Sequence, residues 1–343
     1  MKGPPLVSVV VPMFRGEEFL QQALDSIAAQ TYADLDVVCV DDGSPDNCGA
    51  IVVRYSMSDP RFRLVSQENR GLSQSRNRGV EESRGDYVLF VDQDDAIHPQ
   101  AINTLVHLAL THDIDAIVFD YREVQHDTNF ANLDMDQHRY SGNQPLAMVP
   151  GTTRLLRGFR EDWWEPRSQL LFLKKKFLKD NALSFCPGIL HEDNLFTYQV
   201  LLRAEKLAEL PDVFSFVRQT VGSMTRAQIT WNHVYSLLIT LGEAHRECRK
   251  YSRGQSVQHR IAMRYVLHNV LNQAVDAYKK TDESNRDILE KKLSGVTDPF
   301  HRLAVRRFRR SSHSRFGWIV KGVRHWWWKG IRRVNLGLGR LAG

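Results

Sequence analysis

The chain has 343 residues, of which 42% are apolar, and a formal net charge of +6. This composition is ordinary for a soluble protein with one large core or two modest ones, and the absence of any apolar run of about 18 residues excludes a predicted membrane-spanning helix. Residues 1–5 lead directly into a predicted strand, so no signal peptide is expected. The cysteines are scattered without pairing or metal-ligand spacing, which fits a reducing cytosol; they are Cys39, Cys48, Cys186 and Cys248.

The first ninety or so residues alternate predicted strands with predicted helices. Residues 6–11 form a continuous apolar run that predicts a buried strand, and the next segment places Leu20, Leu24 and Ile27 on one helical face. Three more strands and one helix are predicted, at 35–40, 63–65 and 86–91 and at 72–82. This alternation predicts an α/β fold with a mainly parallel sheet flanked by helices, in which ligands bind at the carboxyl ends of the strands.

Two of the predicted strands end in carboxylates. Asp41 and Asp42 follow the strand at 35–40, and the run D-Y-V-L-F-V is followed by D-Q-D-D at residues 92–95. Both clusters would lie at one edge of the sheet, where carboxylates can hold a divalent cation against a diphosphate. Asp clusters also cap helices, and residues 99–109 have helical spacing, so the residues alone leave a metal site and a helix cap as alternatives.

Four segments in chain order resemble the family 2 glycosyltransferases of the GT-A fold. They are V-S-V-V-V-P-M-F-R-G-E-E-F-L from residue 7, D-V-V-C-V-D-D-G-S-P-D from residue 36, E-N-R-G-L-S-Q-S-R-N-R-G-V from residue 68 and G-D-Y-V-L-F-V-D-Q-D-D from residue 85. The resemblance implies a Rossmann-like sheet and an inverting enzyme that uses a nucleotide sugar. This chain lacks the motifs that a dehydrogenase or a P-loop protein requires, since neither G-x-G-x-x-G after the first strand nor G-x-x-x-x-G-K-[ST] occurs.

The resemblance also implies which residues bind the donor, with a UDP-sugar as the first expectation. Asp42 would bind the uracil, and a first loop would wrap base and ribose; its members are Pro12, Phe14 and Glu17. Asp92 would face the ribose or the metal, and Asp94 would ligate the Mn or Mg that bridges both phosphates. Further nucleotide contacts are implied for Gly71, Arg76 and Asn77, although Arg76 also fits a surface helix cation.

This chain departs from the family pattern near the donor residues. Arg15 stands where relatives usually carry Asn, and the segment that usually reads A-R-N reads S-R-N, ending at Asn77. In F-V-R-Q-T-V-G-S-M-T at 216–225, Thr220 replaces the second Arg of a family segment, and Arg218 is a candidate diphosphate or acceptor contact. The acceptor's charge preference therefore cannot be carried over from the family.

A second acidic pair, Glu192 and Asp193, opens a predicted helix. Acidic residues favour helix N-termini, so the pair alone fits a helix cap. It lies, however, about 100 residues after D-Q-D-D, where the resembling family places its general base. The resemblance therefore implies that Asp193 takes the proton of the acceptor hydroxyl, with Glu192 as an orienting neighbour. His191 is either a phosphate or acceptor contact or a structural histidine.

We expect three parts in the chain: a GT-A domain at 1–225, a helical region at 226–300 and a basic tail at 301–343. The first domain would hold the nucleotide sugar in residues 1–125 and the acceptor and base in residues 126–225. Two tryptophans in this acceptor half, Trp163 and Trp164, fit either a sugar-stacking platform or core packing. Four residues at helical spacing predict a helix in the second part; they are Val234, Leu237, Leu238 and Leu241.

The basic charge is confined to the end of the chain. Residues 302–343 contain twelve Lys or Arg and no Asp or Glu, so the rest of the chain carries −6. Laid out at about 100° per residue, the tail's apolar residues, Trp327 among them, fall opposite its basic residues, as in a helix lying in an anionic membrane interface. The alternative is a helix that docks on the protein itself, and five glycines between 317 and 339 weaken any single helix.

These patterns together predict a non-processive inverting glycosyltransferase that adds one sugar to a lipid-linked or cell-surface polysaccharide acceptor. We expect it in the cytoplasm, peripheral on the inner face of the cytoplasmic membrane, and without a nucleic-acid partner. No Q-x-x-R-W segment occurs, which argues against a processive synthase. The alternatives are a nucleotidyltransferase, whose Gly-rich Arg- and Lys-containing signature is missing, and a nucleic-acid-binding protein with a basic arm, which leaves the acidic motifs unexplained.

Overall fold

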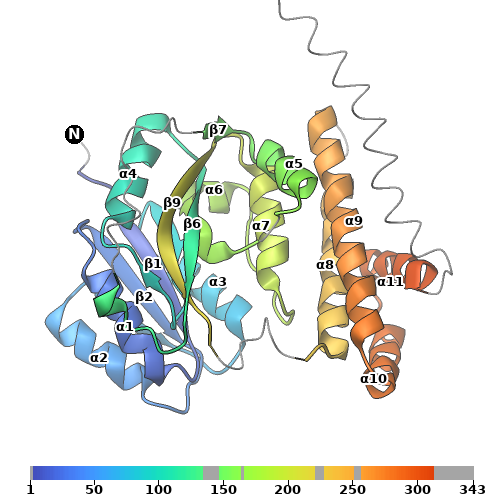
Figure 1. Ribbon diagram of the computed structural model, residues 1–343, viewed down its shortest axis with the longest axis horizontal. Coiled ribbons are helices and arrows are strands. Elements are labelled where there is room, and N and C mark those ends of the chain that lie inside the picture. The colour runs from blue at the N-terminus through green and yellow to red at the C-terminus, as the bar shows by residue number, and fades with distance from the viewer. Residues whose placement is uncertain (1–2, 134–146, 164–165, 221–227, 251–255, 313–343) are drawn as a thin grey trace, which may run out of the picture. The chain divides into compact units, whose positions relative to one another are not determined.

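The computed structural model describes residues 3–133, 147–163, 166–220, 228–250 and 256–312. It divides the chain into two compact units. The first unit comprises residues 1–228 and 248–266, and the second comprises residues 229–247 and 267 onward. In the described part of the chain, the first unit holds a nine-stranded sheet with helices on both faces (Figure 1).

The predicted strands of the first half are confirmed, and they pair in parallel. They are β1 (Val7–Met13), β2 (Leu35–Asp41), β3 (Phe62–Ser66) and β4 (Tyr87–Phe90). Their order in the sheet is β3-β2-β1-β4, so the chain passes to one side of β1 first and then to the other side. The carboxyl ends of β1 and β4 therefore flank a topological switch point, where α/β sheets bind ligands.

Beyond β4 the sheet becomes mixed, which the sequence patterns did not predict. β8 (Leu171–Lys174) runs antiparallel to both of its neighbours, β4 and β6 (Ala116–Val124). β6 then pairs in parallel with β9 (Leu207–Arg218). Two short strands pair antiparallel with β9, namely β5 (Ala96–Ile97) and β7 (Ala147–Val149).

Alternate side chains of β1 explain why helices cover both faces of the sheet. Val9 and Val11 belong to one hydrophobic core with Leu24 of α1. Val10 faces α3, where a Cβ added to Gly79 would lie 2.2 Å from Val10 Cγ1, so only glycine allows this close approach. On the first face lie α1 (Glu17–Ala28), α2 (Cys48–Ser58) and α4 (Ala101–His112); on the second lie α3 (Leu72–Glu82), α6 (Lys175–Asp180), α7 (Glu192–Arg203) and, beside α7, α5 (Gly151–Glu161). Two single-turn helices, η1 (Phe130–Asn132) and η3 (Ser168–Leu170), lie in the connections.

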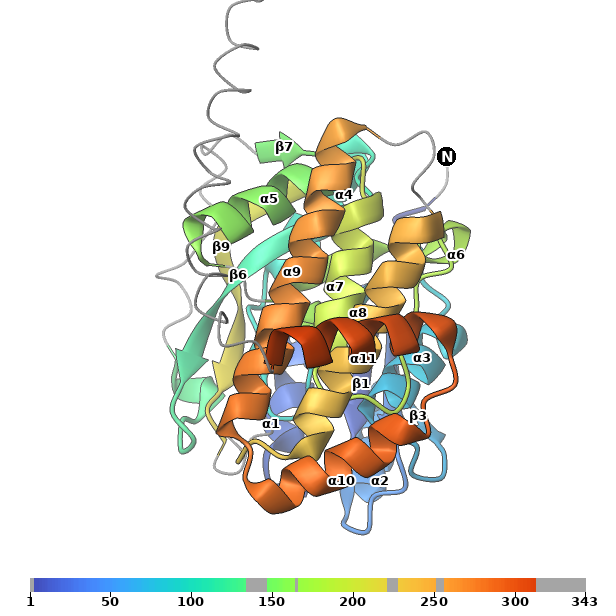
Figure 2. The same cartoon turned by 90° about the vertical axis from the view of Figure 1, so that its right-hand side faces the viewer.

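The second unit is helical. It contains most of α8 (Trp231–Lys250) and α9 (Val257–Lys280), together with α10 (Glu283–Ser294) and α11 (Pro299–Ser312). The predicted apolar face of α8 is confirmed as buried; it comprises Val234, Leu237, Leu238 and Leu241. Figure 2 shows α11 crossing α8 and α9, and a Cβ on Gly242 of α8 would lie 2.0 Å from a ring carbon of His301 in α11.

The first part of the predicted basic tail lies in α11. Residues 302–312 form most of this helix, which buries Ala304, Val305 and Phe308. The remainder of the predicted amphipathic tail, 313–343, lies outside the described residues. Among the helices that the structure describes, none is long and apolar enough to cross a bilayer.

Candidate functional site

The first loop of the predicted donor site is bonded to the loop that follows β2. The Glu17 backbone N–H donates to Asp46 Oδ2 at 3.0 Å, and the Asn47 backbone N–H donates back to Glu17 Oε2 at 2.9 Å. Pro12 is buried within β1, whereas the Phe14 side chain remains 38% exposed. The loop is therefore fixed by its backbone and presents an aromatic ring to solvent.

Arg15, which stands where the family usually has Asn, adopts a left-handed backbone conformation with φ +51°. Asn enters this region more readily than other non-glycine residues, which gives a physical reason for the family preference. In this chain the Arg15 N–H donates to Ser44 Oγ at 2.7 Å, and its guanidinium carbon lies 5.2 Å from the centre of the Phe14 ring. These two contacts offset the cost of the conformation.

Gln93, the second residue of D-Q-D-D, connects the metal motif to the first loop. Its side-chain Oε1 accepts from the Phe14 N–H at 2.8 Å, and its Nε2 donates to the Phe14 carbonyl at 3.0 Å. A Cβ on Gly16 would lie 2.2 Å from the Gln93 side chain. The sequence reasoning missed this role, because an amide between acidic residues gives no sign of its distant partner.

Asp42 organises the turn that precedes α3. Its Oδ1 accepts from Gln67 Nε2 at 2.7 Å and from the Arg70 N–H at 2.9 Å, and its Oδ2 accepts from the Gly71 N–H at 2.7 Å. Gly71 has φ +85°, a conformation that favours glycine. The resemblance implied a uracil contact for Asp42, but the carboxylate is only 3% exposed and both of its oxygens already accept hydrogen bonds.

The carboxylates of D-Q-D-D raise one another's pKa values. Burial and the nearby charge of Asp92 raise the pKa of Asp94 to about 6. Burial and the charges of Asp94 and Asp92 also raise the pKa of Asp95 well above its usual range, although Asp95 Oδ1 accepts from the Arg218 N–H at 3.0 Å. Thr220 Oγ1 lies 3.4 Å from Asp94 Oδ2. Asp94 is therefore a carboxylate with few donors in a negative environment, which favours binding of an additional cation.

Only two of these carboxylates, Asp92 and Asp94, are available as direct ligands, because Asp95 is turned toward the backbone of β9. No group of three or more His, Cys, Asp or Glu suited to a metal ion occurs among the described residues. A hard divalent cation at Asp92 and Asp94 would therefore take its remaining oxygen ligands from a substrate or water, which is the usual arrangement for Mg²⁺. The carboxylate oxygens of Asp92 and Asp94 therefore fit a hard divalent cation as ligands.

Arg218 has internal partners. Its guanidinium donates to the carbonyls of His126 and Thr128 at 2.6 and 2.7 Å. It is also held between the rings of Phe19 and Phe130, 4.5 and 4.4 Å from their centres. We predicted a diphosphate or acceptor contact for Arg218; such a contact would require the exchange of these bonds, because only 4% of the residue is exposed.

One buried guanidinium connects the two acidic motifs. Arg76 Nη2 donates to Asp92 Oδ1 at 2.8 Å, while its Nη1 donates to Glu192 Oε1 at 2.6 Å and to Asp193 Oδ1 at 2.9 Å. Arg76 is 1% exposed, which excludes the surface-cation interpretation. Burial alone would lower its pKa, but the charges of Asp193, Asp92 and Glu192 outweigh burial and raise it. Residues that lie 100 positions apart in the sequence therefore share one cation.

Asn77, the next residue, holds the segment that leads to the second motif. Its Nδ2 donates to the Phe185 carbonyl at 2.9 Å, and its Oδ1 accepts from the Phe185 N–H at 2.8 Å. The resemblance implied nucleotide contacts for Arg76 and Asn77. In the structure, both side chains bond to residues within 185–193, and the nucleotide contacts stay predictions. His191, with φ +57°, immediately precedes α7 at the end of this segment.

The negative charge around Arg76 exceeds its positive charge. Burial raises the pKa of Glu192 to about 7; Arg76 opposes this shift and the charge of Asp193 adds to it. Glu192 is buried, whereas 22% of the Asp193 side chain is exposed. Asp193 is therefore the member of the pair that a solvent-borne hydroxyl group can reach, and Glu192 is the member that fixes Arg76.

Trp163 contacts side chains of α5. Its ring is 38% exposed and faces the guanidiniums of Arg154 and Arg157, 5.0 and 5.8 Å from the ring centre, and its Nε1 donates to Glu161 at 3.0 Å. The exposed ring does not belong to a core. Trp164 lies outside the described residues.

Comparison with known proteins places this chain among glycosyltransferases. The sequence model described as glycosyl transferase family 2 matches residues 8–185, just over half of the chain. The glycosyltransferase EpsJ of Bacillus subtilis is 29% identical over 64% of this chain and 63% of its own, so the chain spans less than two thirds of that relative.

Two solved structures share the fold at low identity. Staphylococcus aureus TarS 1–349 in complex with UDP-GlcNAc has a TM-score of 0.58 and 19% identity, with 90% of each chain covered. The mannosyltransferase PcManGT of Pyrobaculum calidifontis, in complex with GDP-Man and Mn²⁺, has a TM-score of 0.55 and 16% identity, with 95% of this chain and 88% of its own covered. These similarities identify a GT-A type of fold.

Proposed function

The chain belongs to glycosyl transferase family 2, and from this premise we propose that it is a non-processive inverting glycosyltransferase. It transfers one sugar from a nucleotide sugar to a hydroxyl of a lipid-linked or cell-surface polysaccharide acceptor. One observation carries the proposal. The buried guanidinium of Arg76 contacts both Asp92 of the donor motif and Asp193 of the second motif, so the donor phosphates and an acceptor-activating carboxylate border the same space.

For the donor, we propose a UDP-sugar held by the loops after β1 to β4. Phe14, exposed on a loop that Gln93 fixes, packs against the base or ribose, and Asp42 shapes the turn at Gly71. Two observations on other proteins support a nucleotide sugar: TarS was solved with UDP-GlcNAc and PcManGT with GDP-Man. Both proteins share the fold of this chain, and the sugar itself is left to experiment.

We propose Asp92 and Asp94 as the ligands of a divalent metal, Mn²⁺ or Mg²⁺. The raised pKa of Asp94 supports this assignment, because a bound cation would relieve the repulsion between the two carboxylates. When bound, such a cation supplies positive charge to the leaving diphosphate. PcManGT, which has the same fold, was solved with Mn²⁺.

Asp193 is proposed as the general base. Its carboxylate lies at the first turn of α7 with one oxygen held 2.9 Å from Arg76 Nη1, and it is accessible to an acceptor. It takes the proton of the acceptor hydroxyl as that oxygen attacks the anomeric carbon, and the bond from that carbon to the diphosphate breaks. Arg76, itself fixed by Glu192, orients Asp193. The attack from the face opposite the diphosphate inverts the anomeric configuration.

The proposed location is the cytoplasmic face of the membrane, where a lipid-linked acceptor would be presented. The charge distribution supports this location, since all of the excess positive charge lies in residues 302–343.

Product analysis tests the proposed function. The purified chain is incubated with UDP-, GDP- and dTDP-sugars in Mn²⁺ or Mg²⁺, and the released nucleotide is identified. Release of nucleoside diphosphate by transfer or slow hydrolysis is expected, whereas release of pyrophosphate would identify a nucleotidyltransferase. Asp94→Ala should lose metal dependence and donor affinity together, and unchanged UDP binding with or without Mn²⁺ would overturn the metal assignment. The exposed Asp180→Ala in α6 is the matched control.

A further inference from the structure

The last described helix, α11, buries one apolar face within the second unit, while Leu303 stays exposed. Ala304, Val305 and Phe308 are buried, and the ring of Phe308 meets the ring of Tyr278 edge-on with centres 5.3 Å apart. His301 Nε2 lies 2.9 Å from Glu243 Oε1 in α8. This part of the basic region therefore cannot place its apolar stripe in a lipid bilayer while the helix stays folded on α8 and α9 (Figure 2).

The opposite side of α11 is covered by arginine. The five arginines of the helix are all exposed: Arg302, Arg306, Arg307, Arg309 and Arg310. Four of them share one stripe of about 100° around the helix axis, at Arg302, Arg306, Arg309 and Arg310. No Asp or Glu occurs in α11. The helix thus presents a mainly positive surface, which also contains the exposed side chain of Leu303.

Few of these charges are neutralised. Arg309 pairs with Glu290 of α10 at 2.5 Å, and Arg302 Nε donates to the Val296 carbonyl at 3.1 Å. Within the described ranges, Arg306, Arg307 and Arg310 have no ion-pair partner. Exposed guanidiniums without carboxylate partners are suited to phosphate groups, which they bind through two parallel hydrogen bonds.

We propose that this arginine face of α11, residues 302, 306, 307, 309 and 310, docks the protein on the anionic phospholipid headgroups of a membrane. The helix lies along the surface with its arginines toward the phosphates, and its apolar side stays in the protein. Charge complementarity supports this partner, as does the continuing chain, since residues 313–343 add seven Lys or Arg, four Trp and no acidic residue. The choice of a membrane over another polyanion rests on the proposed function, whose acceptor is lipid-linked.

This mode of binding differs from the predicted one in a measurable way. Insertion of an apolar stripe would give binding that persists at high salt, whereas headgroup docking through arginine is screened by salt. Each basic residue near an anionic membrane contributes about a fivefold factor in binding. Removing the three arginines without ion-pair partners should therefore weaken vesicle binding on the order of 100-fold at low salt.

The test uses the full chain carrying Arg306→Gln, Arg307→Gln and Arg310→Gln. Sedimentation is measured with phosphatidylcholine vesicles that contain or lack phosphatidylglycerol, at low and high salt. A matched control removes the same charge from exposed positions on other helices, through Arg54→Gln, Lys176→Gln and Lys179→Gln. We expect the α11 variant to lose binding to the anionic vesicles and the control to bind like the wild type.

Three results would overturn the proposal. In the first, the α11 variant binds anionic vesicles as well as the control does. In the second, the wild type binds neutral vesicles equally well, which would indicate apolar insertion. In the third, the variant keeps vesicle binding but loses binding to single-stranded RNA, which would identify a nucleic-acid surface. Donor hydrolysis is measured on each protein, so failure of the proposed enzymatic function is recorded separately from failure of membrane docking.

Discussion

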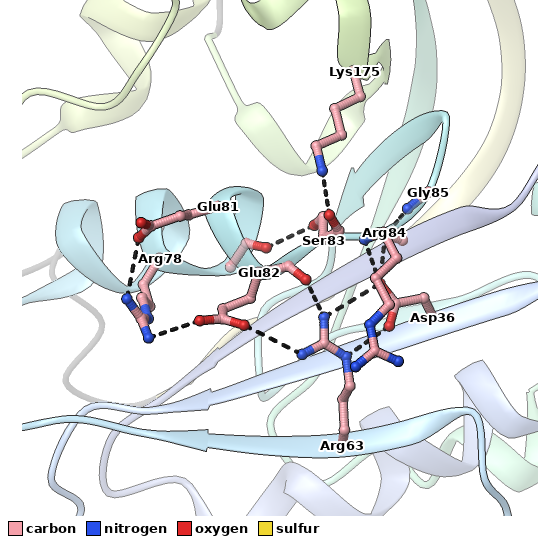
Figure 3. A network of polar contacts seen from close by, with 11 residues as sticks. Asp36, Arg63, Arg78, Glu81, Glu82, Ser83, Arg84, Gly85 and Lys175 are labelled. Atoms are coloured by element: carbon pink, nitrogen blue, oxygen red, sulfur yellow. Dashed lines mark hydrogen bonds and ion pairs between the residues drawn. The ribbon is translucent and has the colours of Figure 1, made fainter.

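Two buried arginine–carboxylate clusters lie at opposite ends of the parallel strands, and they differ in their balance of charge. At the amino ends, the buried carboxylate of Asp36 accepts from Ser8 Oγ at 2.7 Å, Arg63 Nε at 2.7 Å and the Arg84 N–H at 2.9 Å, and Arg63 Nη1 also lies 3.7 Å from the Glu82 carboxylate (Figure 3). Burial would raise the pKa of Asp36, but these hydrogen bonds outweigh it and lower the pKa. The cluster is satisfied by its own partners.

At the carboxyl ends, the carboxylates outnumber the donors that serve them. One guanidinium, Arg76, serves three carboxylates, and Glu192 has a pKa raised to about 7 by burial. Arg76 Nε has no hydrogen-bond partner among the described residues. A cluster with surplus carboxylates remains able to take up a proton or a cation, whereas a satisfied cluster only stabilises the fold. The difference supports the proposal that the reaction takes place at the carboxyl ends of the strands, whereas the cluster at the amino ends stabilises the fold.

Among the substitutions that distinguish the cluster at the carboxyl ends from the one at the amino ends, Asp193→Asn is expected to have the largest effect on the rate of transfer. The substitution removes the proposed proton acceptor and keeps its size, so transfer should fall by about 10²- to 10⁴-fold. Metal-dependent UDP binding should stay within about twofold, because the base acts on the acceptor and not on the donor. Steady-state kinetics and calorimetric titration with UDP and Mn²⁺ provide the two measurements. Turnover close to that of the wild type would refute the role of Asp193.

Arg76→Gln should have the next largest effect. It leaves three carboxylates without their shared cation, and removing one partner of a buried ion pair costs about 3–5 kcal/mol. Denaturant unfolding measures this loss of stability. Arg78→Gln, two residues away on the exposed side of α3, is the control and should change stability by less than about 0.5 kcal/mol.

A double substitution sharpens this test. At about pH 8, above the Glu192 pKa of about 7, adding Glu192→Gln to Arg76→Gln removes one of the uncompensated charges, so the pair should be less destabilising than the sum of the single changes. If the effects were additive, or if Arg76→Gln were as mild as Arg78→Gln, the shared-cation description of the site would be wrong.

Asp36→Asn tests the cluster at the amino ends of the strands, in which Asp36 has its full set of hydrogen-bond donors. Hydrogen bonds to a charged group are lost at Arg63 and Arg84, and we expect a cost of about 2 kcal/mol at neutral pH. Because the folded pKa of Asp36 is lowered, its stabilisation is present above the ordinary pKa of Asp and is lost as the pH falls through the folded value. The difference between variant and wild type should therefore shrink in acid. Transfer per folded molecule should be unchanged, and a large loss of turnover would mean that the amino ends also serve the reaction.

Local sequence patterns predicted the carboxyl edge of the parallel strands well, for physical reasons. An apolar run that ends in carboxylates can satisfy both burial and solvation only if the strand ends at the sheet edge, so the ends of the strands that precede Asp42 and Asp92 were predicted correctly. Helix α3 was predicted with its observed bounds, Leu72–Glu82. These features depend on periodicity over ten residues or so and not on distant contacts.

The junction between the two motifs was not predictable in the same way. Arg76 meets Asp193 only because residues 96–191 return along the sheet, and part of that path is β8, a four-residue strand with no alternating pattern. The family resemblance supplied the role of Asp193 but not its partner. The contacts of Gln93 and Asn77 could likewise not be predicted from the sequence, because an amide that bonds to a distant backbone leaves no periodic signal.

Glu192→Gln is expected to give the smallest effect, and its sign depends on pH. The folded pKa of Glu192 is raised from 4.5 to about 7, so its contribution to stability is fully present below 4.5 and is lost as the pH rises through 7. The variant cannot ionise. At about pH 5.5 the two proteins should have similar stability, and at about pH 8 the variant should gain on the order of 1 kcal/mol relative to the wild type.

Thermal unfolding of both proteins at the two pH values, without nucleotide or metal, measures this change. A gain at the higher pH would mean that Glu192 carries a proton near neutrality, which leaves Arg76 to balance Asp92 and Asp193. A difference that stays constant with pH would mean that Arg76 keeps Glu192 ionised throughout. The two clusters would then differ in their number of carboxylates but not in protonation, and the proton-accepting capacity of the carboxyl edge would rest on Asp193 alone.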